Sequence, residues 1–232
     1  MAEPGTMDGH RPFKRVDLQC ILARYITEYS IVVAEETFDP FYFESAFTHK
    51  SVHRETSYER LEFVGDAIYS AVVSTYIYER YPGESEAFLT RLRVKLVTGT
   101  FMAQLSHAMA LDTYVRLAPS HEAMRSRPSL KEDVFEAFVG AIYMAMGYDT
   151  VYSFVVGVLE EHADLSELAR DILGPREAVI RMAEQITGGK PEFKTRADGG
   201  MDIVDLHGAV IASGSDAARA YKSALDQMIQ AL

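Results

Sequence analysis

Apolar residues recur at intervals of three and four over residues 16–168, the spacing that gives an α-helix one buried face. The pattern is clearest in the segments AIYSAVVSTYIYERY, EDVFEAFVGAIYMAMG and VYSFVVGVLEEH. Turn-forming residues interrupt it at Pro82-Gly83, in the polar run 119–128, and at Gly147. This part of the chain is therefore predicted to be an all-helical domain.

The pattern changes near Gly174. A helix predicted over residues 175–186 is followed by two glycines and by three short alternating runs, EFKTR, MDIVDLHG and AVIASG, and a last helix is predicted from about residue 216 to 232. An α-β-β-β-α order of this length suits a small appended module. We therefore expect two domains, at 15–168 and 174–232, after a disordered leader over 1–14 that is rich in Gly, Pro and charge.

Composition narrows the class of protein. The chain has 232 residues with 48% hydrophobic content, enough for a proper core. Its single cysteine, Cys20, excludes an internal disulfide framework and is expected in the core, since it lies within the apolar run LQCIL. There is no secretory signal and no apolar run approaching the roughly 18 residues of a membrane span. We expect no membrane partner and an intracellular protein, cytoplasmic by default, or in the host-cell cytoplasm if the protein is viral.

The net charge of −11 argues at first against a nucleic-acid partner, because phosphate backbones are usually met by basic surfaces. The charge is only a global sum, however. Carboxylates gathered around divalent metal ions can bind a polyanion, since the ions reverse the local sign.

Two of the helical segments carry acids among apolar residues. Glu59, Glu62 and Asp66 in SYERLEFVGDAIYS are spaced by three, four and seven, so they lie on one side of a helix, and Asp133 and Glu136 are again three apart. Like charges in core-like helices are unfavourable, and a bound divalent cation is the simplest reason for them. Oxygen ligands without Cys or His favour Mg²⁺ or Mn²⁺ over zinc.

The alternative is that these acids lie on solvated faces and pair with basic neighbours such as Arg60, Arg91, Arg93 or Lys131. This alternative suits any one Asp or Glu better than the whole set. Phe63, Phe135 and Phe138 beside the acids indicate helices that are packed on most sides.

Four motifs, in order, resemble the ribonuclease III family. YERLEFVGDAIYS resembles its signature NERLEFLGDAVL, and SAFTHKS resembles A-L-T-H-x-S. FLTRLRVKLV resembles the helix ending R-x-x-L-V, and LKEDVFEAFVGAIYMAMG resembles the second acidic helix, D-x-x-E-A-L-I-G-A-I-Y-L-D-x-G. The resemblance covers about residues 20–160 and is specific, because four motifs at the usual intervals rarely coincide.

The resemblance implies a metal site. In the family, the second Glu and the Asp of the signature, with the Asp and Glu of the later helix, bind catalytic Mg²⁺, for which Mn²⁺ can substitute. The matching residues here are Glu62, Asp66, Asp133 and Glu136. Asp66 and Glu136 are expected to be indispensable to the chemistry.

Two further acids match family positions. Glu59 is expected near the same valley, and Glu86 is expected to reach across a dimer towards the partner's catalytic site. His49 in THKS is expected to be a buried, hydrogen-bonded structural histidine rather than a catalytic one.

The implied activity is metal-assisted hydrolysis of double-stranded RNA, leaving a 5′-phosphate and a 3′-hydroxyl. Family members dimerise through the signature helix, whose apolar positions match Phe63, Val64 and Ile68, so two sites cut opposite strands and leave a short 3′ overhang. The alternative is a non-catalytic double-stranded RNA-binding or scaffold protein that keeps the fold, against which the retained acids argue. Whether such an enzyme processes RNA or degrades small duplex RNA stays open.

The C-terminal module resembles a double-stranded RNA-binding domain, which reads A-form shape across the minor groove. It departs from the family pattern, since Ala217, Ala218 and Tyr221 stand in place of a lysine cluster and a Gly-Pro-x-His loop is missing. From residue 174 onward there are seven Lys and Arg against eight Asp and Glu. Either the module is a degenerate domain used for protein contacts or packing, or it binds RNA through Lys190, Lys194, Arg196, Arg219 and Lys222.

Overall fold

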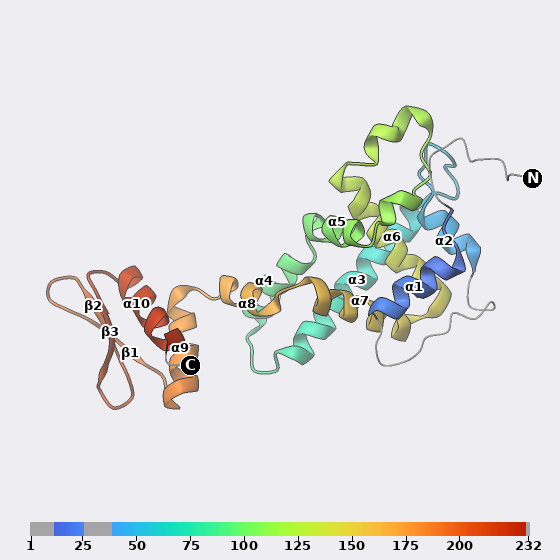
Figure 1. The fold of residues 1–232 in the computed structure, drawn as a ribbon. Helices are drawn as coiled ribbons and strands as arrows, with labels where there is room; N and C mark the ends of the chain where they lie inside the picture. Colours follow the sequence, from blue (N-terminus) through green and yellow to red (C-terminus); the bar gives the residue numbers. More distant parts are fainter. Residues whose placement is uncertain (1–11, 26–38, 231–232) are drawn as a thin grey trace, which may run out of the picture. The chain divides into compact units, whose positions relative to one another are not determined.

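A computed structural model of the chain describes residues 12–25 and 39–230, and divides into two compact units at residues 1–165 and 166–232 (Figure 1). The first eleven residues of the expected disordered leader lie outside the described residues. Phe13 does not fit that prediction, because its ring packs 5.6 Å from Phe43 and 4.8 Å from Phe47 between centroids. The prediction of disorder is therefore wrong at Phe13, whose partly buried ring packs against aromatic residues of the core.

The first unit is helical, as the sequence predicts. Its elements are α1 (Arg15–Tyr25), α2 (Pro40–Ala46), α3 (Glu59–Arg80), α4 (Glu86–Leu96), α5 (Gly99–Ala108), the 3₁₀ helices η2 (Leu111–Tyr114) and η3 (Pro119–Met124), α6 (Pro128–Met146) and α7 (Tyr148–His162).

Local chemistry sets the helix ends. Ser85 caps α4 by accepting a hydrogen bond from the Phe88 backbone N–H at 3.3 Å. Pro128 lies in the first turn of α6, where its missing N–H costs nothing. Gly147 separates α6 from α7 with φ of 82°, a left-handed value that glycine adopts without strain.

The core of this unit is built around α3 and α6. The middle of α6 is buried on every side, from Val134 to Ile142. Cys20 is exposed, so the prediction of a core cysteine is wrong: α1 buries the face that carries Leu18 and Leu22 instead. No helix in the described ranges is long and apolar enough to cross a bilayer.

The second unit has the predicted α-β-β-β-α order. After α8 (Leu165–Ile172), at which the two units divide, it consists of α9 (Pro175–Thr187), β1 (Glu192–Thr195), β2 (Met201–Val204), β3 (Val210–Gly214) and α10 (Ala217–Gln230). The strands form an antiparallel sheet in the order β1-β2-β3. The two helices α9 and α10 cover one face of this sheet (Figure 1). Their small core includes Val179, Ala183, Ile203, Ala212 and Ala220.

Candidate catalytic site at the crossing of two helices

Helices α3 and α6 lie side by side in the first unit (Figure 1). Two glycines, Gly65 on α3 and Gly140 on α6, lie where these helices cross. A Cβ atom at Gly65 would overlap the carbonyl oxygen of Glu136, and one at Gly140 would overlap that of Leu61. Only glycine leaves room for two helix backbones to approach so closely. The crossing therefore fixes the relative position of the acidic residues on both helices.

Four of the predicted acids flank this crossing. Glu62 and Asp66 lie on α3 on either side of Gly65, and Asp133 and Glu136 lie on α6 before Gly140. Glu136 is buried, with 8% of its surface exposed, Glu62 and Asp133 are partly buried, and Asp66 is exposed. The crossing brings the four predicted acids together, and their burial decreases from Glu136 in the core to Asp66 at the surface.

These carboxylates raise one another's pKa values. Burial, followed by the charge of Asp66, raises the pKa of Glu136 to about 8. Burial, followed by the charges of Asp133 and Glu59, raises the pKa of Glu62 to about 7. Within the described part of the chain neither Glu136 nor Asp66 has a hydrogen bond or ion pair through its side chain. The site therefore concentrates acidic groups, and in two of them the ionised form is disfavoured.

Glu132 joins this group, although the sequence reasoning missed it. Burial and then the charges of Asp133 and Asp66 raise the pKa of its carboxyl group. Its carboxylate lies against Gly99, at the start of α5, where a Cβ atom would overlap it. In the sequence Glu132 directly precedes Asp133, and this position was the available signal. A helical spacing of three or four residues does not single out an adjacent acid.

Glu59 lies at the edge of the group and is already paired. Lys50 Nζ donates to its Oε1 at 2.7 Å, and Ser57 Oγ donates to its Oε2 at 3.4 Å. This ammonium group also opposes the rise in the pKa of Glu62 and of Asp133. Lys50 is therefore a cation that partly offsets the charge of the site.

Glu86 lies on a different helix from the four acids at the crossing. It lies in the first turn of α4 and accepts a hydrogen bond from Thr90 Oγ1 at 2.7 Å. It is not among the main groups that raise the pKa of Glu62 or Glu136. A cavity of about 310 Å³ between α3 and α4 is lined by Ser74, Ile77, Tyr78, Glu86, Leu89, Thr90 and Arg93. Within one chain, Glu86 belongs to this cavity.

His49 is the structural histidine that was expected. It is 3% exposed, and its Nδ1 accepts the Ser51 backbone N–H at 3.0 Å. Burial lowers its pKa, followed by the charges of His121 and Lys50. A buried ring with a lowered pKa and a hydrogen bond to Ser51 supports the fold, and within the described residues its Nδ1 bonds Ser51 rather than an acid of the site.

The donor chemistry fits a hard divalent cation. The residues at the crossing offer only oxygen, and two of them have raised pKa values that a cation would reverse. In residues 12–25 and 39–230, however, no three Asp, Glu, His or Cys side chains are arranged so as to enclose a metal ion. Metal binding would therefore require some of these carboxylate side chains to turn towards one another.

One face of α3 is left uncovered by the part of the chain that the structure describes. Phe63 is 80% exposed and Tyr78 is 68% exposed, and Ala67, Ala71 and Thr75 between them are exposed as well. These positions follow one another at three or four residues, so they form a continuous stripe. Val64 and Ile68, also predicted to lie in an interface, are partly buried beside it.

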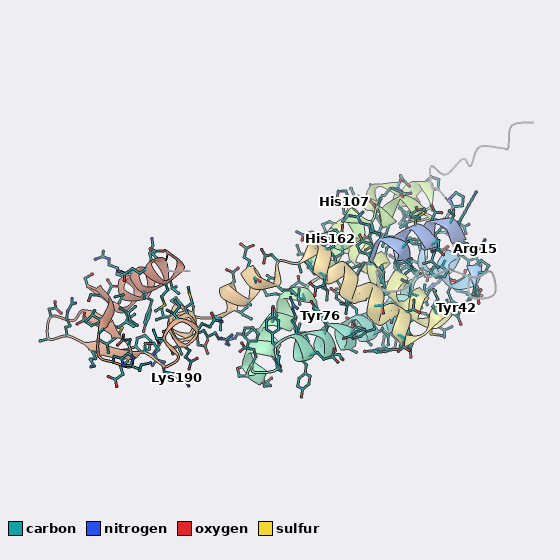
Figure 2. The ribbon with its side chains drawn as sticks, turned by 60° about the horizontal axis from the view of Figure 1, so that its bottom comes forward. Arg15, Tyr42, Tyr76, His107, His162 and Lys190 are labelled. Atoms are coloured by element: carbon teal, nitrogen blue, oxygen red, sulfur yellow. The ribbon has the colours of Figure 1, made fainter. Side chains whose placement is uncertain are left out.

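In the second unit, four of the five candidate RNA-binding cations are ion-paired with acids of the same unit. Lys190, labelled in Figure 2, follows α9. The pairs are Lys190 with Glu184 at 3.8 Å, Lys194 with Glu192 at 3.3 Å, Arg196 with Asp202 at 2.8 Å and Arg219 with Asp216 at 3.7 Å. Lys222 has no such pair among the residues that the structure describes.

Comparisons with known proteins agree with one another. A family model described as Ribonuclease-III-like matches residues 39–163. Ribonuclease 3 of Francisella tularensis subsp. novicida is 32% identical over 200 residues, which cover 81% of this chain and 86% of that protein. Putative protein A464R of Paramecium bursaria Chlorella virus 1 is 29% identical over 226 residues, 93% of this chain and 77% of that protein.

A solved structure matches the first unit. It is the nuclease domain of ribonuclease III from Campylobacter jejuni, in a study of flexibility in the region involved in dimer formation. It is 26% identical, with a TM-score of 0.56, and the match covers 65% of this chain and 99% of that domain.

Proposed function

Because the chain belongs to the ribonuclease III family of double-strand-specific endoribonucleases, we propose that it hydrolyses duplex RNA with Mg²⁺, leaving 5′-phosphates and short 3′ overhangs. The chain is an endoribonuclease, a hydrolase, by that membership. The observation that carries the proposal is Glu136, a buried carboxylate without a counter-charge, at a helix crossing with four more carboxylates, those of Glu62, Asp66, Glu132 and Asp133, near it.

Each of the four carboxylates has a proposed role. Glu62, Asp66, Asp133 and Glu136 would hold Mg²⁺, with Mn²⁺ as a substitute. When bound, the cation supplies an activated water and stabilises the charge that develops on the phosphate and on the leaving 3′ oxygen. Glu136 is buried, so it would bind the cation from the core side of the site. Asp66 is exposed and would bind it from the solvent side, where a phosphodiester can approach.

The rival function, a non-catalytic scaffold that binds duplex RNA, is less well supported. A scaffold has no need of Glu136 in the core, since an uncompensated buried carboxylate is unfavourable for folding. Retention of all four acids, together with the glycine pair that positions them, favours the catalytic role.

The uncovered stripe on α3 supports a homodimer. Phe63 and Tyr78 are 15 positions apart, or about 22 Å along the helix. In a two-fold dimer with antiparallel α3 helices, each end of the stripe meets the opposite end of the partner's stripe. Phe63 would then enter the cavity next to Tyr78 of the partner subunit, which Glu86 lines. Glu86 of the partner subunit would come close to Glu62 and complete the site.

The second unit is proposed to add little affinity for RNA. An acid lies within 4 Å of four of the five candidate cations, so the local net charge of this unit is low. Phosphate neutralisation dominates the affinity for nucleic acid. The first unit, together with the metal ions that it binds, would then provide most of the affinity for RNA.

A cleavage assay tests the proposal. Purified protein is incubated with long duplex RNA and Mg²⁺, next to Asp66→Asn and to the control Asp149→Asn, an exposed acid in the first turn of α7. We expect Asp66→Asn to lose cleavage by a factor of at least about 100, typical of removing an essential charged group at a reacting centre, and Asp149→Asn to cut as the wild type does. Equal products from both variants, or none from the wild type, would contradict the enzymatic role.

A further inference from the structure

Tyr58 occupies the position where the family signature quoted above has asparagine. It directly precedes α3 and is 4% exposed. Its hydroxyl group donates a hydrogen bond to Oδ2 of Asp133 at 3.2 Å, and so links the start of α3 to α6. An asparagine side chain is several ångströms shorter than tyrosine, so this link is particular to the residue found here.

Tyr58 is itself held in place at several points. Its backbone N–H donates to the carbonyl oxygen of Thr48 at 2.9 Å, and its own carbonyl oxygen accepts the N–H groups of Leu61 and Glu62 at 2.9 Å. Its ring lies 5.8 Å from the ring of His49, between centroids. The phenol therefore reaches Asp133 from a rigid base, and the THKS segment that carries Thr48 and His49 supplies part of it.

The bond occupies one oxygen of Asp133. A carboxylate that accepts a hydrogen bond at Oδ2 is restricted in its side-chain rotation. The Asp133 carboxylate also accepts a hydrogen bond from its own backbone N–H, but each carboxylate oxygen has two acceptor sites, so Oδ1 can still bind a further partner. Partners of this kind fix the orientation of metal-ligating side chains, and their removal typically lowers metal affinity or activity by about 10- to 100-fold.

We propose that Tyr58 is a positioning residue of the metal site, which holds the Asp133 carboxylate in the orientation in which Oδ1 faces the cation. The inference rests on the proposed function, since it needs Asp133 to be a ligand. Tyr58 acts through Asp133 and does not touch substrate. Its phenol thus lowers the reorganisation that metal binding requires at one of the four carboxylates.

Tyr58→Phe tests this role, because it removes the hydroxyl group and keeps the ring. A matched control is Tyr114→Phe, since the Tyr114 hydroxyl group also donates to a carboxylate at 3.2 Å, that of Asp17, at a buried position without a proposed role in catalysis. The binding of Mn²⁺ to the full-length protein without RNA is measured by calorimetry. Cleavage is measured as a function of Mg²⁺ concentration, and thermal stability is measured in EDTA.

We expect Tyr58→Phe to bind Mn²⁺ about 10-fold more weakly than the wild type and to need correspondingly more Mg²⁺ for half-maximal cleavage, with its activity restored at saturating Mg²⁺. Tyr114→Phe is expected to keep both values. Unchanged metal affinity in Tyr58→Phe overturns the inference, as does a loss of thermal stability with no change in metal affinity, since that result assigns Tyr58 to packing alone. A wild-type protein that neither binds Mn²⁺ nor cuts duplex RNA overturns the proposed function and this inference together, which distinguishes the two failures.

Discussion

Glu136 is a carboxylate that the fold buries without giving it a counter-charge. The free energy of folding has to compensate for this, because a buried negative charge loses its hydration. The neighbouring Asp66 and Glu132 make the ionised form still less favourable. In its ionised form, which predominates only above about pH 8, the residue therefore lowers the stability of the fold.

Glu136→Gln is expected to separate stability from activity. The amide removes the buried charge at the same size, so the free energy of unfolding at pH 8 in EDTA should rise, and a gain of 1 kcal/mol would raise the melting temperature by about 2–4 °C in a unit of this size. Cleavage should be lost. Thermal melts next to the exposed Asp149→Asn test this, and a Glu136→Gln variant that melts below the wild type would contradict the expectation.

The pH dependence of stability follows from the same groups. The folded protein has raised pKa values for Glu62, about 7, and Glu136, about 8, whereas an unfolded glutamate has its ordinary value near 4.3. The folded state therefore binds these two protons more tightly, and the stability they contribute is lost as the pH rises from about 4.5 through 8. Over this pH window the wild type should lose stability relative to the double variant Glu62→Gln/Glu136→Gln. Denaturant titrations of both proteins in EDTA at several pH values measure this. A difference that does not vary with pH would mean that these carboxyl groups titrate normally.

Helical spacing in the sequence was enough to predict that Glu62 and Asp66 share a side of one helix, and Asp133 and Glu136 a side of another, since spacing depends only on residue number. Burial could not be predicted in this way. Asp66 is exposed and Glu136 is buried because α6 is enclosed and the outer face of α3 is not. The prediction that Cys20 is buried was wrong for the same reason, because an apolar run does not indicate which of its residues faces the core.

At the scale of elements, the α3–α6 crossing is the feature on which the site depends. Periodicity predicted both helices, and Pro82-Gly83 and Gly147 marked their ends. Gly65 and Gly140 carried no such signal, because a glycine inside a helix is recognisable as a close-contact point only when the opposing backbone is known. The mutual distance of the acids was therefore beyond sequence reasoning.

Gly65→Ala is expected to push the two helices apart. The added methyl group overlaps the carbonyl oxygen of Glu136, and overpacking of this kind destabilises by about 1–3 kcal/mol. Cleavage should fall as well, because the two halves of the carboxylate group separate. Gly83→Ala is the control, since a Cβ atom at that exposed position meets nothing within 4 Å. Equal melting temperatures and equal activity in the two variants would show that the crossing tolerates a side chain.

At the scale of the whole molecule, the uncovered stripe on α3 predicts a dimer. Phe63→Asp places a charge at the most exposed apolar position of the stripe and should convert the protein to a monomer in light scattering. Tyr148→Asp, an exposed apolar position on α7, should leave the mass unchanged. A Phe63→Asp variant that remains dimeric would place the interface elsewhere.

The second unit should gain affinity for RNA when its cations are released. Glu184→Gln, Glu192→Gln and Asp216→Asn together remove the partners of Lys190, Lys194 and Arg219. In a Glu136→Gln background, which we expect to prevent cleavage, duplex RNA should bind more tightly and with a steeper dependence on salt, since more phosphate contacts release more counterions. Unchanged affinity and salt dependence would show that ion pairing is not what limits RNA binding by this unit.

The most direct test of the proposed activity is the chemistry of the product ends as Mg²⁺ is titrated. Long duplex RNA is cut by the wild type and by Glu136→Gln, and the fragments are analysed for terminal phosphate and for overhang. The carboxylate site at the α3–α6 crossing predicts Mg²⁺-dependent fragments with 5′-phosphates and short 3′ overhangs from the wild type, and intact RNA from Glu136→Gln. Fragments that form equally in EDTA, or that Glu136→Gln produces at the wild-type rate, would contradict it.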